Sequence, residues 1–358
     1  MKPLIKWPGG KGREIKNFEK LIPKFDKYIE PFFGGGAVFF YLEPNKAYIN
    51  DVSSNLILFY KMIKENNEEF IEYLKKYSLI WNLLLDTVSK DIELLNNYYD
   101  EEDEQNLKKY IKKISANTYD EKIILNTERF EKILKKNVFD KFKRTKKNEE
   151  KAPFTKKDLR ENLITGFMSG LYMYFRDIYN EVMLDKIVVS NAYKIANFYF
   201  IREYCYGSMF RYNSKGEFNI PYGGISYNGK NFNEKINNLL KKETQNLFRT
   251  TNIECKDFEE FIDNLELTEN DFIFLDPPYD TEFSDYEGRE FNKKDQERLY
   301  KTLKKVPAKF LLVIKNTDFI YNLYERDFNI LSFDKNYTYN VRSRNERGVE
   351  HLIITNYM

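Results

Sequence analysis

The run Asp276-Pro277-Pro278-Tyr279 combines groups that could activate an amine. It directly follows the apolar run 272–275, whose composition indicates a buried strand, and open α/β sheets bind ligands at the carboxyl ends of their strands. The prolines restrict the backbone and remove two N–H donors, so the Asp276 carboxylate and the Pro277 carbonyl could both accept from one amino group. The ring of Tyr279 offers a flat face on which a nucleic-acid base, flipped out of its duplex, could stack. These four residues are the predicted catalytic group.

A glycine-rich turn is the candidate cofactor loop. The turn, Pro31-Phe32-Phe33-Gly34-Gly35-Gly36, follows a short predicted strand at Tyr28-Ile29, and glycine lets the backbone approach a ligand closely. Its spacing is not the GxGxxG of dinucleotide-binding loops. Asp51 follows the next predicted strand, 47–49, where a carboxylate could accept hydrogen bonds from ribose hydroxyls. The pattern favours a nucleoside-like cofactor other than a dinucleotide.

Two further segments could close around such a cofactor. Lys6-Trp7-Pro8-Gly9-Gly10-Lys11 joins cations, an aromatic ring and glycines, and Asp257-Phe258 follows a predicted strand at 252–255 and could hold an adenine ring. The predicted cofactor-binding residues are Trp7, Gly10, Lys11, Pro31, Phe32, Gly34, Gly36, Asp51, Asp257, Phe258 and Asp276.

Histidine and cysteine usage narrows the chemistry. His351 is the single histidine and opens an apolar strand, so we expect a structural role and exclude a Ser-His-Asp triad. The two cysteines, Cys205 and Cys255, form no CxxC pair, which excludes a disulfide scaffold, and we expect no metal site. This pattern favours a reaction whose leaving group is already activated, such as transfer from a sulfonium methyl donor.

The elements that must position these residues suggest an interrupted α/β fold. Strand and glycine-loop signals occupy both ends of the 358 residues, whereas apolar residues recur at helical spacing between 56 and 135. We therefore expect a doubly wound, mixed-sheet, Rossmann-like domain formed by 1–60 and 246–358. Residues 61–245 should form an inserted, mainly helical recognition domain.

The charge and the hydropathy of the chain limit which partners and which compartment we expect. The formal net charge is +2, so any nucleic-acid site must be a local patch. A run of 18 apolar residues and a signal-peptide pattern are both absent, so we expect a cytoplasmic protein without a membrane segment.

Two segments of the middle region stand out. Residues 206–229 predict a hairpin with its tip at Lys215-Gly216, and 141–160 hold nine basic residues against three acidic ones. The basic run indicates either a solvated loop or a phosphate-binding segment.

Taken in order, these motifs resemble the Dam-like class of DNA adenine-N6 methyltransferases, of the alpha or D12 type. The resemblance covers roughly residues 1–60 and 165–358. It implies S-adenosylmethionine as cofactor, duplex DNA as partner and a flipped adenine as methyl acceptor. A cognate restriction endonuclease in the same system is a further expected partner.

The resemblance also implies DNA contacts. The segment from Arg211 to Gly223 is similar to the family's DNA-reading hairpin, and the tail 339–357 is similar to its closing segment. The implied DNA-binding residues are Arg211, Tyr212, Asn213, Lys215, Pro221, Arg342, Arg344 and Asn345.

Three alternatives stay open from the sequence. Cytosine N4 presents an amine of the same geometry, although Asp rather than Ser at 276 favours adenine. An RNA or protein-amide methyltransferase is disfavoured by the hairpin and by Asp rather than Asn at that position. A catalytically silent DNA-binding regulator is disfavoured because the catalytic run and the glycine loop are both intact. Residues 75–160 are longer than a typical family member has there, so the recognition sequence is not implied.

Overall fold

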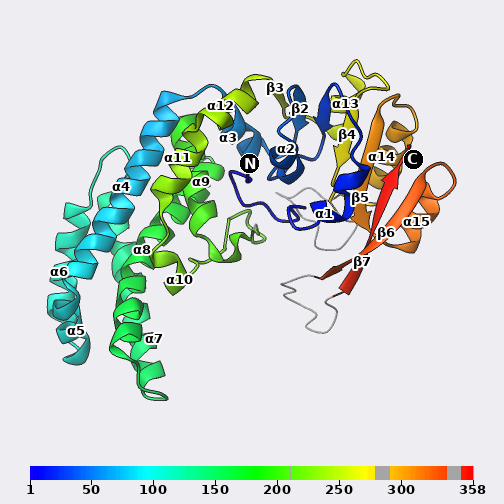
Figure 1. The fold of residues 1–358 in the computed structure, drawn as a ribbon. Helices are drawn as coiled ribbons and strands as arrows, with labels where there is room; N and C mark the ends of the chain where they lie inside the picture. The colour runs from blue at the N-terminus through cyan, green and yellow to red at the C-terminus, as the bar shows by residue number, and fades with distance from the viewer. Residues whose placement is uncertain (210, 279–290, 337–347, 358) are drawn as a thin grey trace. The chain divides into compact units, whose positions relative to one another are not determined.

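The computed structural model describes residues 1–209, 211–278, 291–336 and 348–357 (Figure 1). By its internal contacts the chain divides into two compact units, one from Met1–Glu65 with Lys241–Met358 and the other from Asn66–Leu240. Four residues given roles from the sequence lie outside the described residues, namely Tyr279, Arg342, Arg344 and Asn345.

The first unit is built on a mixed sheet. Within the described residues the sheet has seven strands in the order β3-β2-β1-β4-β5-β7-β6. They are β1 (Tyr28–Glu30), β2 (Ala47–Asn50), β3 (Thr251–Glu254), β4 (Phe272–Leu275), β5 (Lys309–Lys315), β6 (Asn329–Asn336) and β7 (Gly348–Thr355). Strands β1 to β5 pair in parallel, whereas β7 runs antiparallel to both β5 and β6. The α/β prediction and the predicted strands are confirmed.

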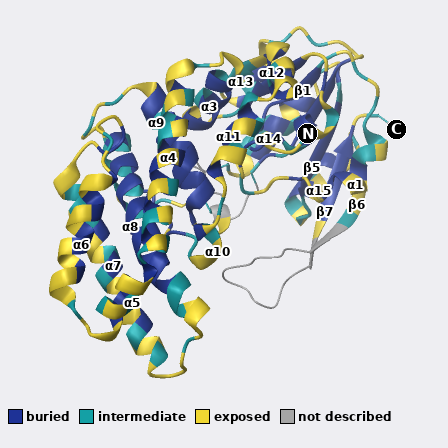
Figure 2. Cartoon of the chain, turned by 60° about the vertical axis from the view of Figure 1, so that its left-hand side comes forward, coloured by how far each residue is buried: buried dark blue, intermediate teal, exposed yellow. Residues whose placement is uncertain are grey.

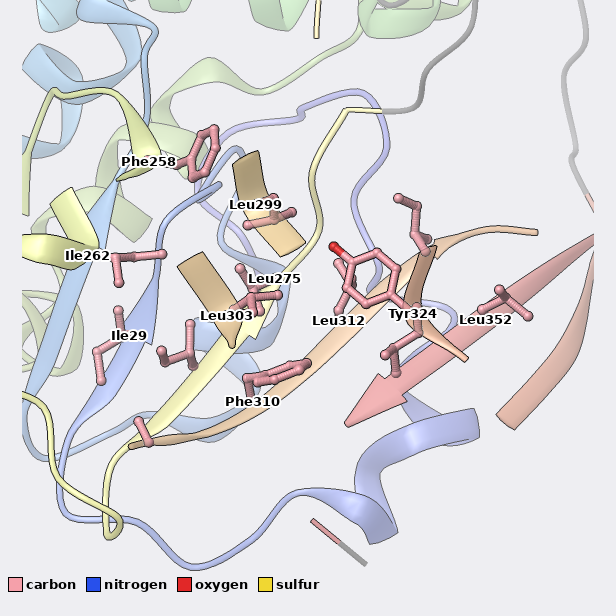
Figure 3. Close-up of a cluster of buried hydrophobic side chains, with 14 of the residues drawn as sticks. Ile29, Phe258, Ile262, Leu275, Leu299, Leu303, Phe310, Leu312, Tyr324 and Leu352 are labelled. Carbon is pink, nitrogen blue, oxygen red and sulfur yellow. The ribbon is translucent and has the colours of Figure 1, made fainter. Parts of the chain in front are cut away.

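Helices cover both faces of this sheet. They are α1 (Ile15–Phe18), the 3-10 helix η1 (Glu19–Leu21), α2 (Ala37–Leu42), α3 (Ser54–Lys64), α12 (Lys242–Arg249), α13 (Phe258–Asp263), α14 (Lys293–Leu303) and α15 (Asp318–Tyr324). On one face Leu275 of β4 joins a cluster with Leu299 of α14 (Figure 3). Ile273 belongs to the same cluster. On the other, Phe274 stacks on Phe18 of α1 at 5.6 Å. Because successive strand residues point to opposite faces, the unbroken apolar run of β4 matches a strand buried on both sides.

The strand order places a ligand site at one edge. β1 lies between β2 and β4, so the chain leaves β1 towards one side and enters β4 on the other. Ligands of open α/β sheets bind outside the carboxyl ends of strands at such a reversal. The loops after β1, β2, β3 and β4 all leave from this edge, and each carries a predicted site residue.

The second unit is helical. Its helices are α4 (Glu68–Lys90), α5 (Ile92–Asp100), α6 (Glu104–Asn117), α7 (Thr127–Glu149), α8 (Lys156–Met183), α9 (Asn191–Tyr204), the 3-10 helix η2 (Tyr206–Ser208), α10 (Ile225–Asn228) and α11 (Phe232–Leu240). In Figure 2, α8 is largely buried while α5 and α6 show much exposed surface. Across the described residues, each helix is too short or too polar to cross a membrane.

The structure of the helical unit changes two interpretations that were made from the sequence. The basic run 141–160 is not one loop, because α7 continues to Glu149 and α8 begins at Lys156. The segment that follows α9 and includes η2 and α10, which we call the hairpin segment (residues 205–229), turns at its expected tip, with Gly216 at φ +76°. Among its described residues, the antiparallel pairing consists of isolated bridges at Cys205–Tyr222 and Tyr212–Phe218.

Candidate cofactor and active site

The loops at the carboxyl edge of the sheet enclose a cavity of about 780 Å³. This volume lies within the ~300–1,000 Å³ typical of small-molecule sites. All its lining residues belong to the first unit. The predicted site residues that line it are Trp7, Gly10, Lys11, Pro31, Phe32, Gly34, Gly36, Asp51, Asp257, Phe258, Asp276, Pro277 and Pro278.

The loop after β1 requires glycine at two positions. Gly34 has φ +50° and Gly36 has φ +65°, a region that side chains disfavour. A Cβ on Gly34 would lie 2.8 Å from Cδ1 of Trp7, and one on Gly36 would lie 2.4 Å from Cζ of Phe33. The glycines therefore let this backbone form part of the cavity wall directly against the N-terminal segment.

Asp51 shapes the same loop. Its Oδ2 accepts from the Gly34 N–H at 2.8 Å, and its Oδ1 accepts from the Ser53 N–H at 2.9 Å. Burial raises the pKa of Asp51, while these backbone donors act in the opposite direction. Because each carboxylate oxygen has two acceptor sites, Asp51 could hold the loop and still accept from a ligand.

Asn50 is a site residue that the sequence reasoning missed. It is fully buried, its Nδ2 donates to the carbonyls of Pro31 (3.1 Å) and Lys256 (3.0 Å), and its Oδ1 accepts from the Lys256 N–H (2.8 Å). The side chain thus ties the loop after β1 to the loop after β3. A polar residue closing a buried strand, just before Asp51, was the available signal.

An aromatic wall lies beside Asp257. The ring of Phe258 packs 5.4 Å from Phe32 and 5.7 Å from Phe291. Arg298 of α14 places its Nη2 2.6 Å from Asp257 Oδ1 and its guanidinium 4.9 Å from the Phe258 ring centroid. The sequence did not identify Phe291 or Arg298, since neither belongs to a recognisable motif.

Asp276 has a charged partner from the far end of the chain. Lys11 Nζ forms an ion pair with the Asp276 carboxylate and also donates to the Gly9 carbonyl at 3.2 Å. Lys11 is 1% exposed and Asp276 is 18% exposed. Lys11 was predicted as a cofactor residue, and its contact places it equally beside the predicted catalytic acid.

Helix α14 holds the loop that carries the two prolines. Gln296 is fully buried, and its Nε2 donates to the Pro278 carbonyl at 3.3 Å. Since Pro277 and Pro278 have no N–H groups, hydrogen bonds can hold their backbone only at the carbonyls, and Gln296 makes one such bond. Gln296 is a second residue on α14 that sequence reasoning missed.

Glu30, the last residue of β1, lines the cavity and is buried. Its carboxyl group accepts from the Tyr28 hydroxyl at 2.8 Å. Burial raises the pKa of Glu30 well above its ordinary value, the negative charges of Asp276 and Asp51 add to this, and the Tyr28 hydrogen bond opposes it. The folded protein therefore keeps the proton on Glu30 to higher pH than the unfolded chain does.

A Glu30→Gln variant should flatten the pH dependence of stability. The folded pKa exceeds the unfolded value of about 4.3, so the folded state binds more protons and stability falls as the pH rises from there towards the folded pKa. Glutamine cannot ionise but can still accept from Tyr28. Thermal midpoints between pH 5 and 8 should decline more steeply in the wild type than in the variant. Glu254→Gln, at the half-buried end of β3, is the control, and parallel curves for wild type and Glu30→Gln would contradict the assignment.

His351 lies outside this site. It is buried in β7, with its ring 5.7 Å from that of Phe333, and it is not among the residues lining the cavity. In the described ranges, His, Cys, Asp and Glu side chains do not gather into a group that could hold a metal ion.

The described DNA-contact candidates lie in the hairpin segment. Arg211 and Lys215 are exposed, and Arg211 Nε donates to Asn219 Oδ1 at 3.1 Å. The Asn213 side chain is used within the tip, where Oδ1 accepts from the N–H groups of Lys215 (2.9 Å) and Glu217 (3.0 Å). Tyr212 lies 3.2 Å from the Tyr179 hydroxyl, and the Pro221 carbonyl accepts from the Tyr206 N–H at 2.8 Å. Asn213 therefore shapes the tip, which leaves Arg211 and Lys215 as the exposed cations.

Comparison with known proteins gives matches along the whole chain. A model of the D12 class N6 adenine-specific DNA methyltransferases matches residues 7–162 and 155–339. The Type II methyltransferase M.MjaIII of Methanocaldococcus jannaschii is 30% identical over 377 residues, which covers 100% of this chain and 99% of that protein. The Type II methyltransferase M.CviBI of a Paramecium bursaria Chlorella virus is 28% identical, with all of both chains covered. The Retron Ec67 DNA adenine methylase of Escherichia coli is 24% identical over 85% of this chain and 72% of its own length.

Proposed function

This chain belongs to the D12 class of N6 adenine-specific DNA methyltransferases, and from that premise we propose that its cavity binds S-adenosylmethionine beside a flipped adenine. The enzyme is an adenine-specific DNA methyltransferase, which requires a methyl donor and a DNA substrate. The observation that carries the proposal is the convergence of the glycine loop, Asp51 and Asp276 on one cavity.

The residues around the cavity fit this cofactor. The positive-φ glycines, whose Cβ atoms would strike Trp7 and Phe33, let the loop backbone pack closely against these two aromatic side chains in the cavity wall. Asp51 offers carboxylate oxygens for ribose hydroxyls, and the aromatic wall of Phe258 and Phe32 suits a purine ring. Acidic groups nearby suit a ligand that carries a positive charge. When bound, S-adenosylmethionine supplies a methyl group on a sulfonium sulfur, a leaving group that needs no further activation.

Asp276 is the proposed proton acceptor. An exocyclic amine is a poor nucleophile because its lone pair is delocalised into the ring, and acceptors on its N–H groups favour the attacking form. The Asp276 carboxylate and the Pro277 carbonyl are the proposed acceptors. The amine gains a methyl group and loses one proton, for which Asp276 is the charged acceptor. Lys11 holds this carboxylate and Gln296 holds the Pro278 carbonyl, so the chain contributes positioning and electrostatics.

DNA contact is proposed for the helical unit. The resemblance of Arg211–Gly223 to a DNA-reading hairpin and the exposure of Arg211 and Lys215 support this assignment. Similar proteins named type II methyltransferases support a role in restriction-modification, with a cognate endonuclease as proposed partner and the cytoplasm as proposed compartment.

A transfer assay tests the function. Purified protein, tritium-labelled S-adenosylmethionine and unmethylated DNA should yield labelled N6-methyladenine. Nucleoside analysis of the product separates the outcomes, because label in N4-methylcytosine or no label in DNA would reject the adenine assignment.

Arg211→Ala should relax sequence specificity. An arginine can make two hydrogen bonds to one base edge, worth about 1–3 kcal/mol of discrimination, so the loss should concentrate at one base pair of the recognition site. Binding titrations on the cognate duplex and on single-base variants measure it. Equal weakening on every duplex would instead assign Arg211 to the phosphates.

A second set of variants provides the contrast with Arg211→Ala. It neutralises the basic residues Lys146, Lys147, Lys156 and Lys157. If these lysines contact phosphates, binding should weaken on all sequences alike. The slope of log affinity against log salt should fall by about 0.9 per lost contact. An unchanged salt slope would show that this basic run does not contact DNA.

A further inference from the structure

Among its described residues, strand pairing supports the hairpin segment only locally: the Asn213 N–H donates to the Glu217 carbonyl at 2.9 Å, and the Asn219 N–H donates to the Arg211 carbonyl at 3.2 Å. Its antiparallel bridges at Cys205–Tyr222 and Tyr212–Phe218 are isolated. Isolated two-stranded hairpins are at best marginally stable in water. A surface that reads base edges must present its side chains at a defined register, so the segment needs support from a neighbouring element.

Helix α8 supplies this support in the half that contains Phe218 and Ile220. Asn180 accepts from the Phe218 N–H at 2.8 Å and donates to the Phe218 carbonyl at 3.1 Å. These are the two bonds that an opposing residue in an antiparallel ladder would make. The Ile220 carbonyl accepts from the Tyr172 hydroxyl at 2.9 Å and from Arg176 Nη1 at 3.1 Å.

The same helix reaches the tip and the far end of the segment. The Tyr179 hydroxyl lies 3.2 Å from that of Tyr212, next to Arg211. At the far end, Asn228 donates to Thr165 Oγ1 at 3.0 Å and accepts from the Tyr222 hydroxyl at 3.0 Å. Asn228 is 3% exposed and Thr165 is 5% exposed, so this network is buried.

These side chains form one stripe along α8. They recur at positions 165, 172, 176, 179 and 180, which the 3.6-residue period of an α-helix places on one face. Each uses a polar atom to engage the segment. Thr165, Tyr172 and Tyr179 are buried and Arg176 and Asn180 are half-buried, in a helix whose other buried positions are mostly apolar. Replacing only one partner of a buried hydrogen bond leaves the other unsatisfied, so the stripe favours a single register of the segment.

We propose that this polar stripe of α8, above all Asn180 with Tyr172, Arg176 and Tyr179, is the positioning element that sets which bases the hairpin segment selects. The inference rests on the proposed function, since it takes the segment to be the DNA reader. The stripe acts through the segment's backbone and through Tyr212. Its residues are positioning residues for specificity, and substituting them should loosen sequence selection while the cofactor cavity keeps its affinity.

The test compares Asn180→Ala with Asn162→Ala. Both asparagines belong to α8, but Asn162 donates to its own helix at Asp158 and makes no bond to the segment that the structure describes. Each variant of the full chain is expressed in cells that lack adenine methylation, and single-molecule sequencing measures methylation at the cognate motif and at its one-base variants. Cofactor affinity is measured on the purified proteins with S-adenosylhomocysteine.

One base-edge contact typically carries about tenfold to hundredfold discrimination. Asn180→Ala should therefore lower the ratio of cognate to one-base-variant methylation by about tenfold, with cofactor affinity and the Asn162→Ala ratio unchanged. If Asn180→Ala does not fold, Tyr179→Phe decides, because it removes one hydroxyl and should lower the ratio by a smaller factor.

Failure of this inference can be distinguished from failure of the proposed function. A wild-type ratio in a folded Asn180→Ala protein, or in Tyr179→Phe where that variant decides, overturns the inference and leaves the enzyme assignment standing. A wild-type protein that methylates no adenine removes the proposed function and this inference with it.

Discussion

Replacing Asp276 by alanine is expected to lower the rate of methyl transfer by ~10²–10³-fold, the loss typical of one preorganised polar contact in an active site. Asp276 follows β4, lines the cavity and is the charged acceptor proposed for the adenine amine. Single-turnover rates with saturating cofactor and DNA measure the effect.

The ion pair with Lys11 dictates the controls for this variant. Asp276→Ala also leaves a buried ammonium without its carboxylate, which destabilises the fold by a separate route. The double variant Asp276→Ala with Lys11→Met removes both charges and should regain thermal stability without regaining transfer. Glu260→Ala, an exposed acid on the same cavity wall, should keep its rate. Near-wild-type turnover by folded Asp276→Ala protein would exclude Asp276 as the proton acceptor.

Replacing Asp51 by alanine is expected to weaken cofactor binding by about 1.5–3 kcal/mol, the range for hydrogen bonds to a charged group. The carboxylate accepts from the Gly34 and Ser53 N–H groups, so its loss should also loosen the glycine loop. Calorimetry with S-adenosylhomocysteine gives the dissociation constant.

Two substitutions separate the possible reasons for this loss. Asp51→Asn keeps one acceptor oxygen and should fall between the wild type and the alanine variant. Glu254→Ala removes an acid at the end of β3 that does not line the cavity, and it should bind like the wild type. A dissociation constant unchanged in Asp51→Ala would remove this residue from the cofactor site.

Local patterns in the sequence predicted strands β1 to β4 and most of the cavity wall. The strand at 272–275 was recognisable because a short, unbroken apolar run that is soon followed by two prolines is typical of a buried strand. The glycine loop was recognisable because positive φ angles at Gly34 and Gly36 require that residue type. Both signals lie within a few neighbouring residues, so one sequence carries them. The order of the motifs then placed the catalytic run and the glycine loop at the same sheet edge.

Only the tertiary structure decided which polar side chains hold these motifs in place. The Lys11–Asp276 pair joins the two ends of the chain, and Asn50, Gln296 and Arg298 are ordinary polar residues without a motif. The same is true of Asn180, whose partner Phe218 lies beyond the end of its helix. A hydrogen bond between distant residues depends on how helices pack, and an isolated Asn, Gln or Arg looks the same in sequence whether it faces water or a buried carbonyl. Their partners give these residues their roles, and those contacts exist only in the folded chain.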